Sequence, residues 1–387
     1  MDTGAGVKLT RRRFITGSTL VTLGAGASGW SWLQYRSPWR TGTILSAFED
    51  ARGDQYIGGV ALASGRVFGA RVPMRAHGCA VDPLHPQRVL YFARRPGTQA
   101  FELHRDADAP DDGPRRGPAA GVAFEAGAGR HLSGHGVFSR AGDLLFVPEY
   151  DYENVRGVVA VRDARDFRIV DEIDTRGIDP HELSWLPDGR RLLVANGGIL
   201  THPRSFRRKL NIDTMDPSLC VIDAASGACL EQWRLPDHRL SIRHLALAHD
   251  GSAAIGLQYE GEPAHAPGVV ALYRSGGLRL LSAPAAEQRR FKGYVASVAV
   301  SEEHDLVAAA CPYGGGVACW SLRQEQYLGF VEASEPYGLS RLADGRIIAS
   351  QRDGTAFDVA RGARAAKTVD FDSDAPIRWD DHWLAAG

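Results

Sequence analysis

The chain has 387 residues, of which 44% are hydrophobic and 24% charged, and its formal net charge is −1 at pH 7. These values are ordinary for a globular protein. Because nucleic-acid-binding proteins usually carry a basic surplus, the near-neutral charge argues against a nucleic-acid partner.

The first 30 residues have the features of an export signal rather than of a folded domain. The basic run Thr10–Ile15, which contains three consecutive arginines, leads into a mildly apolar stretch, Phe14–Ala27, rich in Gly, Thr and Ser. A charged segment, a short apolar segment and small residues in this order are typical of secretory signals. The arginines followed by Phe14 are similar to the twin-arginine type. We predict a signal over residues 1–30, a periplasmic location and no spanning helix beyond the signal; the alternative is an arginine-rich N-terminal arm.

One pattern recurs through the rest of the chain: a short run of small apolar residues, a turn, and a second apolar run. The first runs begin at positions spaced 40 to 63 residues apart, namely His77, His135, His181, His244, Ser297, Tyr337 and His382. Periods of this length are typical of four-stranded propeller blades with insertions. We predict a single all-β domain over residues 43–387, a seven-bladed β-propeller.

The seventh blade requires both ends of the chain. The apolar runs Ile44–Phe48, Tyr56–Leu62 and Val67–Val72 can supply three strands but leave the innermost strand missing. A folded protein seldom ends on an apolar run such as Asp381–Gly387 without a docking place for it. We predict that this run supplies the missing strand, because ring closure removes open sheet edges that would otherwise promote aggregation.

Histidines recur at the start of the predicted innermost strands, which line the central channel of a propeller. Five of the seven starts are histidines, although the chain has only 13 in total. Neutral imidazole is the commonest transition-metal ligand, so we predict a metal, haem or anion site at this mouth. The predicted metal ligands are His77, His135, His181, His244 and His382. Any one of them could instead bond backbone carbonyls across the channel.

We expect ring geometry to spread the five histidines, so that neighbouring pairs rather than all five share an ion. Metal binding should then weaken as the pH falls through about 6.5, where free imidazole takes up a proton.

Polar residues at the ends of the second strands face the same mouth in this arrangement. The predicted ligand-binding set is Arg94, Glu149, Asn196, Gln258 and Glu260. We expect the site to lie off-centre, at His135, His181 and His244. The opposite side of the same channel mouth offers only Ser297 and Tyr337, which are poorer metal ligands. The insertion from Ile199 to Pro217 is expected to cover this site and to bring Asn211 and Asp213 within reach.

Other chemistry has weaker support. The chain contains no Gly-x-Ser-x-Gly elbow, phosphate loop or His-Glu-x-x-His motif, and the absence of Cys-x-x-Cys-His excludes covalent haem of the c type. An acid/base pair could come from four carboxylates, Glu149, Asp151, Glu182 and Glu260.

Several segments, together with the leader, carry a family resemblance: Ala93–Thr98, Gly134–Ser139, Pro180–Leu183, Val194–Ile199, Lys209–Leu219, Ser241–Ala246, Gln258–Gly261 and Arg378–His382. They resemble an exported seven-bladed propeller family described only as a domain of unknown function. Its members are often encoded beside imelysin-type, iron-regulated periplasmic proteins. The resemblance implies a fold, a compartment and a link to iron, but no reaction. Asp381 departs from the family pattern, which has Asn there.

Together these features favour a periplasmic propeller that binds or handles iron, another divalent metal or an iron-bearing compound as an accessory to iron uptake. Its expected partners are a small-molecule or metal ligand and periplasmic iron-uptake proteins. Two alternatives stay open. One is an enzyme, either a lactonase-like hydrolase or a cofactor-dependent oxidoreductase. The other is a protein-interaction scaffold, a common use of propeller faces.

Overall fold

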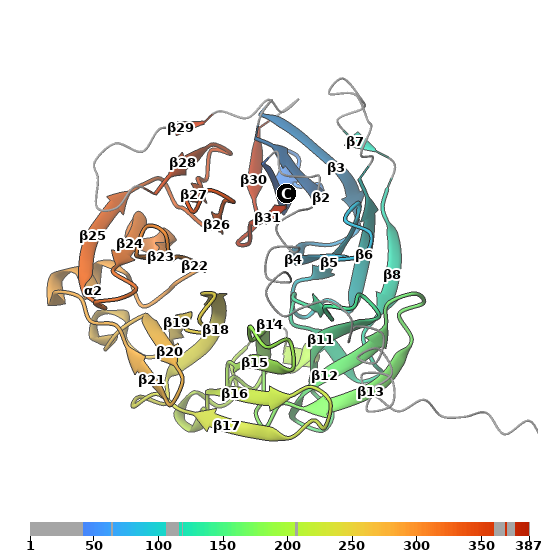
Figure 1. Cartoon of the computed structure of the whole chain (residues 1–387), viewed down its shortest axis with the longest axis horizontal. Helices are drawn as coiled ribbons and strands as arrows, with labels where there is room; N and C mark the ends of the chain where they lie inside the picture. Colours follow the sequence, from blue (N-terminus) through green and yellow to red (C-terminus); the bar gives the residue numbers. More distant parts are fainter. Residues whose placement is uncertain are drawn as a thin grey trace, which may run out of the picture.

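The computed structural model describes residues 42–62, 65–105, 116–117, 119–205, 208–359, 368–369 and 376–386. Seven sheets, each built mainly of antiparallel strands, form a ring (Figure 1), so the predicted seven-bladed β-propeller is confirmed. The predicted export signal lies outside the described residues. Within the residues described, no helix is long and apolar enough to span a membrane.

In blades 1 to 6 the strands lie in the order in which they occur along the chain. The innermost strands of blades 1 to 6 are β4 (Ala76–Val81), β10 (Val137–Phe138), β14 (Pro180–Trp185), β18 (Leu240–Leu247), β22 (Ser297–Ser301) and β26 (Leu339–Arg341). The second strands are β5 (Arg88–Ala93), β11 (Leu144–Asp151), β15 (Arg191–Asn196), β19 (Ala253–Tyr259), β23 (Leu306–Cys311) and β27 (Ile347–Ser350). The third strands are β6 (Gln99–His104), β12 (Arg156–Asp163), β16 (Ser218–Asp223), β20 (Val270–Arg274), β24 (Gly316–Trp320) and β28 (Ala356–Asp358). The outer strands are β8 (Gly121–Glu125), β13 (Ile169–Asp174), β17 (Cys229–Trp233), β21 (Gly277–Leu280), β25 (Tyr327–Glu332) and β29 (Thr368–Val369).

Short elements supplement the blades. A two-residue strand, β7 (Arg116–Gly117), pairs in parallel with β3 of blade 7, and β9 (Arg130–Leu132) pairs with the end of β11. The described helices are α2 (Ala285–Arg290) and four 3₁₀ turns, η2 (Pro203–Ser205), η3 (Ile212–Thr214), η4 (Pro263–His265) and η5 (Pro312–Gly314).

Blade 7 joins the two ends of the chain, as predicted. Its strand β1 (Thr43–Asp50) pairs on one side with β2 (Gln55–Ala61), which pairs with β3 (Arg66–Val72). On its other side β1 pairs with β30 (Ile377–Trp379) and β31 (Leu384–Ala386). The innermost strand therefore begins earlier than residue 381 and is interrupted between its two pieces. His382 lies in this interruption.

The core lies between adjacent blades. The second strands are its centre: every residue of β11 and of β23 is buried. Strands covered on both faces read as continuous apolar runs, which is why these runs were recognisable in the sequence. The packing of each blade against its neighbours in the ring fixes the positions of the innermost strands and of their side chains.

Candidate metal centre

The five histidines lie at or beside irregularities of the innermost strands. The pairing register shifts between Ala76 and Cys79 in β4, between Pro180 and Leu183 in β14, and between Ile242 and His244 in β18. Such β-bulges turn side chains out of the regular alternation and are common beside functional sites. His135 precedes the two-residue strand β10, and His382 separates β30 from β31. The prediction that these histidines are the first strand residues is therefore wrong in detail; His244, for example, is the fifth residue of β18.

Two glycines allow blades 1 and 2 to approach closely at this point. The Gly78 N–H donates to the Gly134 carbonyl at 2.8 Å. Gly134 has a φ of +104°, and a Cβ atom there would lie 2.7 Å from Cδ2 of His77. A Cβ on Gly78 would lie 3.0 Å from Nδ1 of His135. Only glycine satisfies both the backbone conformation and the space at Gly134, so the two histidine rings can pack side by side.

The irregularities gather the five rings into one group, the histidine cluster, which comprises His77, His135, His181, His244 and His382. Ring centroids are 4.3 Å apart for His77 and His382, and 6.5 Å apart for His77 and His244. The cluster is thus tighter than the expected spread-out ring. Ligand atoms lie within 4.8 Å of one another in three groups: His77, His135 and His181; His135, Glu182, His244 and His382; and His77, Asp380 and Asp381. Each group could hold a metal ion, and none contains all five histidines.

One imidazole is oriented by a buried carboxylate. Nδ1 of His77 lies 2.7 Å from Oδ1 of Asp380, and its Nε2 lies 3.1 Å from Nε2 of His382. With Asp380 ionised, Nδ1 of a neutral His77 donates to the carboxylate and Nε2 keeps its lone pair. A carboxylate–histidine pair of this kind fixes the ring and its tautomer in many metal sites. His77 is therefore set to use Nε2 as a ligand.

Asp380 is held ionised by its surroundings. Its second carboxylate oxygen pairs with Nε of Arg75, and its backbone N–H donates to Ala47 of β1. Burial alone would raise the pKa of Asp380, but the charge of Arg75 and the hydrogen bond from His77 together lower it below the usual range. Asp381 forms ion pairs with both arginines: its Oδ1 lies 3.2 Å from Nη2 of Arg75, and its Oδ2 lies 3.3 Å from Nη2 of Arg94. On this side two aspartates balance two arginines.

Glu182 is the carboxylate that faces the cluster. Its Oε2 accepts the Leu245 N–H at 3.1 Å and lies 3.4 Å from Nδ1 of His244, and its Oε1 lies 3.9 Å from Nδ1 of His135. Burial raises its pKa. Nε2 of His135 and Nδ1 of His244 are buried without a hydrogen-bond partner among the described residues. Since buried polar atoms are nearly always paired, these two nitrogens have the character of unused ligand atoms.

The histidines are kept in the form that ligates metals. Burial lowers the pKa of His135 and of His244 to about 3. Burial also lowers the pKa of His181 well below its usual value, with the charge of Arg243 adding to the effect. The pKa values of His77 and His382 are lowered in the same direction by burial and by neighbouring imidazoles. All five rings are therefore neutral at neutral pH and offer lone pairs.

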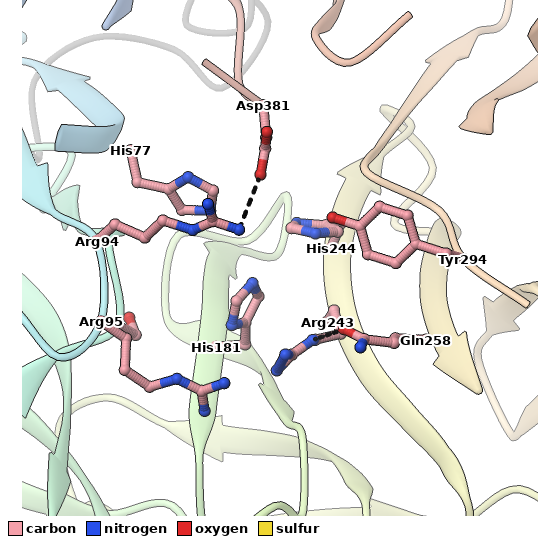
Figure 2. Close-up of a pocket in the computed structure, with 10 residues that line it drawn as sticks. His77, Arg94, Arg95, His181, Arg243, His244, Gln258, Tyr294 and Asp381 are labelled. Atoms are coloured by element: carbon pink, nitrogen blue, oxygen red, sulfur yellow. Dashed lines mark hydrogen bonds and ion pairs between the residues drawn. The ribbon is translucent and has the colours of Figure 1, made fainter. Parts of the chain in front are cut away.

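Two arginines approach the cluster from the opposite side and share one aspartate. Asp179 pairs through Oδ1 with Arg95 and through Oδ2 with Nη1 of Arg243 at 3.1 Å. Nε of Arg243 also donates to Oε1 of Gln258 at 3.3 Å. Figure 2 shows the guanidinium groups of Arg95 and Arg243 reaching toward one another beside His181. Burial lowers the pKa of Arg243, although Asp179 opposes this.

A small cavity of about 30 Å³ is enclosed between the cluster and these arginines. Three of the histidines line it, His77, His181 and His244, together with the arginines Arg94, Arg95 and Arg243 (Figure 2). A larger basin of about 920 Å³ adjoins it, with Arg94, Gln258, Tyr294 and Asp381 lining both. Volumes of several hundred Å³ are usual for small-molecule sites, so the cluster adjoins a space large enough for an organic ligand.

The predicted ligand-binding residues divide into two sets. Arg94 and Gln258 line the cavity. Glu149 does not: β11 continues past it to Asp151 because β9 pairs there, and its carboxylate accepts from Arg162 at 2.7 Å and from the Gly127 N–H. Asn196 instead bonds the Thr175 carbonyl, and Glu260 pairs with Lys209. These three predictions are corrected, because ordinary strand and loop contacts use these side chains.

The insertion lies between the second and third strands of its blade, β15 and β16, as predicted, but Asn211 serves the loop itself and Lys209 pairs with Glu260. Asn211 accepts the Leu200 N–H at 2.7 Å and donates to the Gly198 carbonyl at 2.9 Å. It closes the base of the loop instead of reaching the cluster. Asp213 belongs to η3 and is exposed. Neither residue lines the cavity or the basin.

Three of the four carboxylates considered for an acid/base pair are engaged in other pairs. Glu149 pairs with Arg162, Asp151 with Asn154 and Arg156, and Glu260 with Lys209. Of the four carboxylates, Glu182 alone faces the cluster.

Three charged residues of the site were missed as functional candidates: Asp179, Arg243 and Asp380. A signal was present, because Asp179-Pro180-His181 and Asp380-Asp381-His382 share an aspartate two residues before the histidine. Arg243 directly precedes His244. What the sequence does not show is that the pairs cross blades, Asp380 to His77 and Asp179 to Arg95.

Fold and site together define a seven-bladed propeller with a buried, neutral histidine cluster beside a ligand-sized basin. Residues 70–386 match the family described as "Protein of unknown function (DUF1513)", and the chain belongs to that family.

Comparison with curated proteins gives no match. Among solved structures, a chain from the "Crystal Structure of Mitotic Checkpoint Complex" is similar, with 14% identity, 80% of each chain covered and a TM-score of 0.53. At this identity the likeness concerns the fold alone.

Proposed function

We propose that this protein binds a first-row transition metal, with iron as the expected ion, at the histidine cluster and serves iron uptake as an exported, periplasmic accessory protein. The observation that carries the proposal is the pair of buried imidazole nitrogens without partners, Nε2 of His135 and Nδ1 of His244, beside Glu182. A donor set of imidazoles with one carboxylate is typical of non-haem iron sites. Export and the link to iron uptake are supported by the leader and by the family resemblance.

The groups in place suit this role. His77, oriented by Asp380, and His382 add two more imidazoles, and depressed pKa values keep the cluster unprotonated. When bound, the ion would supply a Lewis-acidic or redox-active centre next to the basin. The chain itself fixes the donor nitrogens, excludes bulk water and holds the surrounding charges.

The test is a metal titration of chelator-treated protein. Iron(II) under anaerobic conditions, Co²⁺, Cu²⁺ and Zn²⁺ are each titrated into wild type, His77→Ala, His181→Ala and His238→Ala, with folding checked by circular dichroism. We expect the first two variants to bind about tenfold or more weakly, as measured for many ligand and near-ligand changes. His238, an exposed histidine outside the cluster, is the control. Equal affinity in wild type and in a His135→Ala variant, whose ring belongs both to the group with Glu182 and to the group with His181, would refute the site.

A metal-dependent enzyme is the second candidate, favoured by the basin of about 920 Å³ that opens beside the cluster. A pure binding protein does not need a second compartment of this size. Turnover of lactones, esters or small reductants by metal-loaded wild type, lost in His181→Ala, would favour an enzyme. The absence of turnover with retained metal binding would favour the accessory role.

A further inference from the structure

The charges beside His181 do not balance. Arg95 and Arg243 share the single carboxylate of Asp179, and Arg243 is almost completely buried. The next carboxylate, Glu260, is paired with Lys209. On the other side of the cavity, Arg75 and Arg94 are matched by Asp380 and Asp381. The Arg95–Asp179–Arg243 group is therefore left with one net positive charge.

An unbalanced buried charge is costly unless a counter-ion joins it. Arg243 uses Nη1 for Asp179 and Nε for Gln258, and its Nη2 makes no hydrogen bond to any described residue. Arg95 donates to Asp179 through Nη1, and this is its only side-chain hydrogen bond to a described residue. Guanidinium groups bind carboxylates and other oxyanions through two parallel N–H bonds, so both arginines have the free donors that such a ligand requires.

We infer that the guanidinium groups of Arg95 and Arg243 form an anion site for a carboxylate or similar oxyanion group, which binds beside the metal on the His181 side. The part that concerns the metal rests on the proposed function. A metal cation next to this positive group is repelled, and an anion between them removes the repulsion. Each ligand should then raise the affinity for the other by the same factor.

The basin indicates how such a ligand enters. Arg94, Gln258 and Tyr294 line both the basin and the cavity, so one end of a molecule in the basin can reach the arginines. The same chemistry could come from a small inorganic oxyanion or from the carboxylate of an organic molecule that fills the basin.

Anion binding to the metal-free protein is the first test, because it does not depend on the metal. Sodium acetate, succinate and sulfate are titrated by calorimetry at constant ionic strength against a chloride background. We expect at least one to bind wild type, and Arg243→Gln and Arg95→Gln to weaken that binding about tenfold, the effect of 1.4 kcal/mol. Tighter binding of succinate indicates an organic carboxylate, and equal or tighter binding of sulfate an inorganic oxyanion. No preference for any of them over chloride overturns the inference.

Asp179→Asn supplies a test of opposite sign. Removing the shared carboxylate increases the positive charge, so the anion should bind more tightly, whereas a purely structural role for the three residues predicts loss or no change. This arm decides the matter if the arginine variants fail to fold. Arg346→Gln, at an exposed ion pair with Asp344 that lines neither the cavity nor the basin, is the control and should leave the affinity unchanged.

Coupling to the metal is measured with Co²⁺ in acetate and in chloride. Tighter Co²⁺ binding in acetate, abolished by Arg243→Gln, supports a shared site. If acetate binds but Co²⁺ does not bind in either buffer, the proposed metal function falls and the anion site stands. If Co²⁺ binds equally in both buffers, the shared site is overturned while the metal function stands.

Discussion

Five blades of the propeller differ from the other two at their innermost strands. Blades 1, 2, 3, 4 and 7 have a bulge, a shortened strand or a gap where their histidine lies. In blades 5 and 6 the innermost strands pair in regular register; the equivalent residues are Ser297, which lies in β22, and Tyr337, which lies two residues before β26 and lines the basin. A regular strand keeps its alternation, so side chains stay in contacts between blades. In the irregular strands the histidine side chains leave this alternation and point toward the histidine cluster.

The regular and irregular innermost strands differ in how far their buried polar groups are hydrogen-bonded. Oγ of Ser297 accepts the N–H of Leu339 at 3.3 Å and so links blades 5 and 6. In the cluster, by contrast, two imidazole nitrogens have no hydrogen-bond partner within the part of the chain that the structure describes. Buried groups left unsatisfied are destabilising, and proteins keep them mainly where function needs them. The comparison therefore separates strands that hold the ring together from strands that present ligands.

The largest effect should come from removing the end of the chain that completes a histidine-bearing blade. Deletion of residues 381–387 removes β31, the buried Trp383 and His382, and it exposes part of the edge of β1. We expect the truncated chain to aggregate and to lose its cooperative unfolding transition, because the ring is opened. Thermal unfolding followed by circular dichroism measures this, with a chain lacking only residues 1–30 as the control. A truncated protein with the melting temperature of wild type would contradict the role of this segment.

Acid should destabilise the histidine side selectively. An unfolded histidine titrates near pH 6.5, whereas the pKa values of His135 and His244 in the fold are about 3. As the pH falls from about 6.5 toward 3, the unfolded chain therefore binds protons that the folded protein cannot, and the unfolding free energy decreases. Each pKa difference of one corresponds to about 1.4 kcal/mol, so the two groups together can lower it by several kcal/mol.

Urea unfolding of metal-free protein between pH 7.5 and 4 measures this loss. His135→Gln, which cannot titrate, should show a shallower decrease than wild type. An equal decrease in both proteins would show that the cluster is not its source. The same lowered pKa values correct the expectation that metal binding weakens near pH 6.5, since the loss should begin at a lower pH.

The fold could be predicted from the sequence because its signals are local and repeated. Each blade has a pair of apolar runs, and the unpaired runs at the two ends match each other. The recurrence of histidines at equivalent places also indicated the cluster. The finer contacts could not be predicted, because a bulge in β14 or the extension of β11 by β9 depends on neighbouring strands. Such features decide that Glu182 faces the cluster and Glu149 faces Arg162.

Within the histidine side, the two aspartates that precede histidines should have different effects. Asp380→Asn keeps an oxygen beside Nδ1 of His77 but loses the charge that fixes its tautomer, so we expect Co²⁺ affinity to fall about 10- to 100-fold. The same change at Asp179, which contacts arginines and no imidazole, should lower it by a smaller factor. Isothermal titration in chloride buffer compares the two variants. Losses of equal size would mean that Asp380 acts only through the overall charge.

The smallest effect on metal binding should come from a substitution in the regular innermost strands. The same substitution should clearly lower the free energy of unfolding. Ser297→Ala removes the acceptor for the Leu339 N–H in a buried place, which should cost about 1–3 kcal/mol of unfolding free energy. Metal affinity should stay at the wild-type value, because Ser297 belongs to none of the three ligand groups and lines neither the cavity nor the basin. His181→Ala should show the reverse, because the imidazole of His181 has no hydrogen bond to any described residue and belongs to a ligand group. Urea unfolding and Co²⁺ titration of the two variants side by side measure both quantities. If Ser297→Ala also weakened the metal, the two kinds of innermost strand would be coupled, and the division of the ring into a structural and a ligand-presenting part would fail.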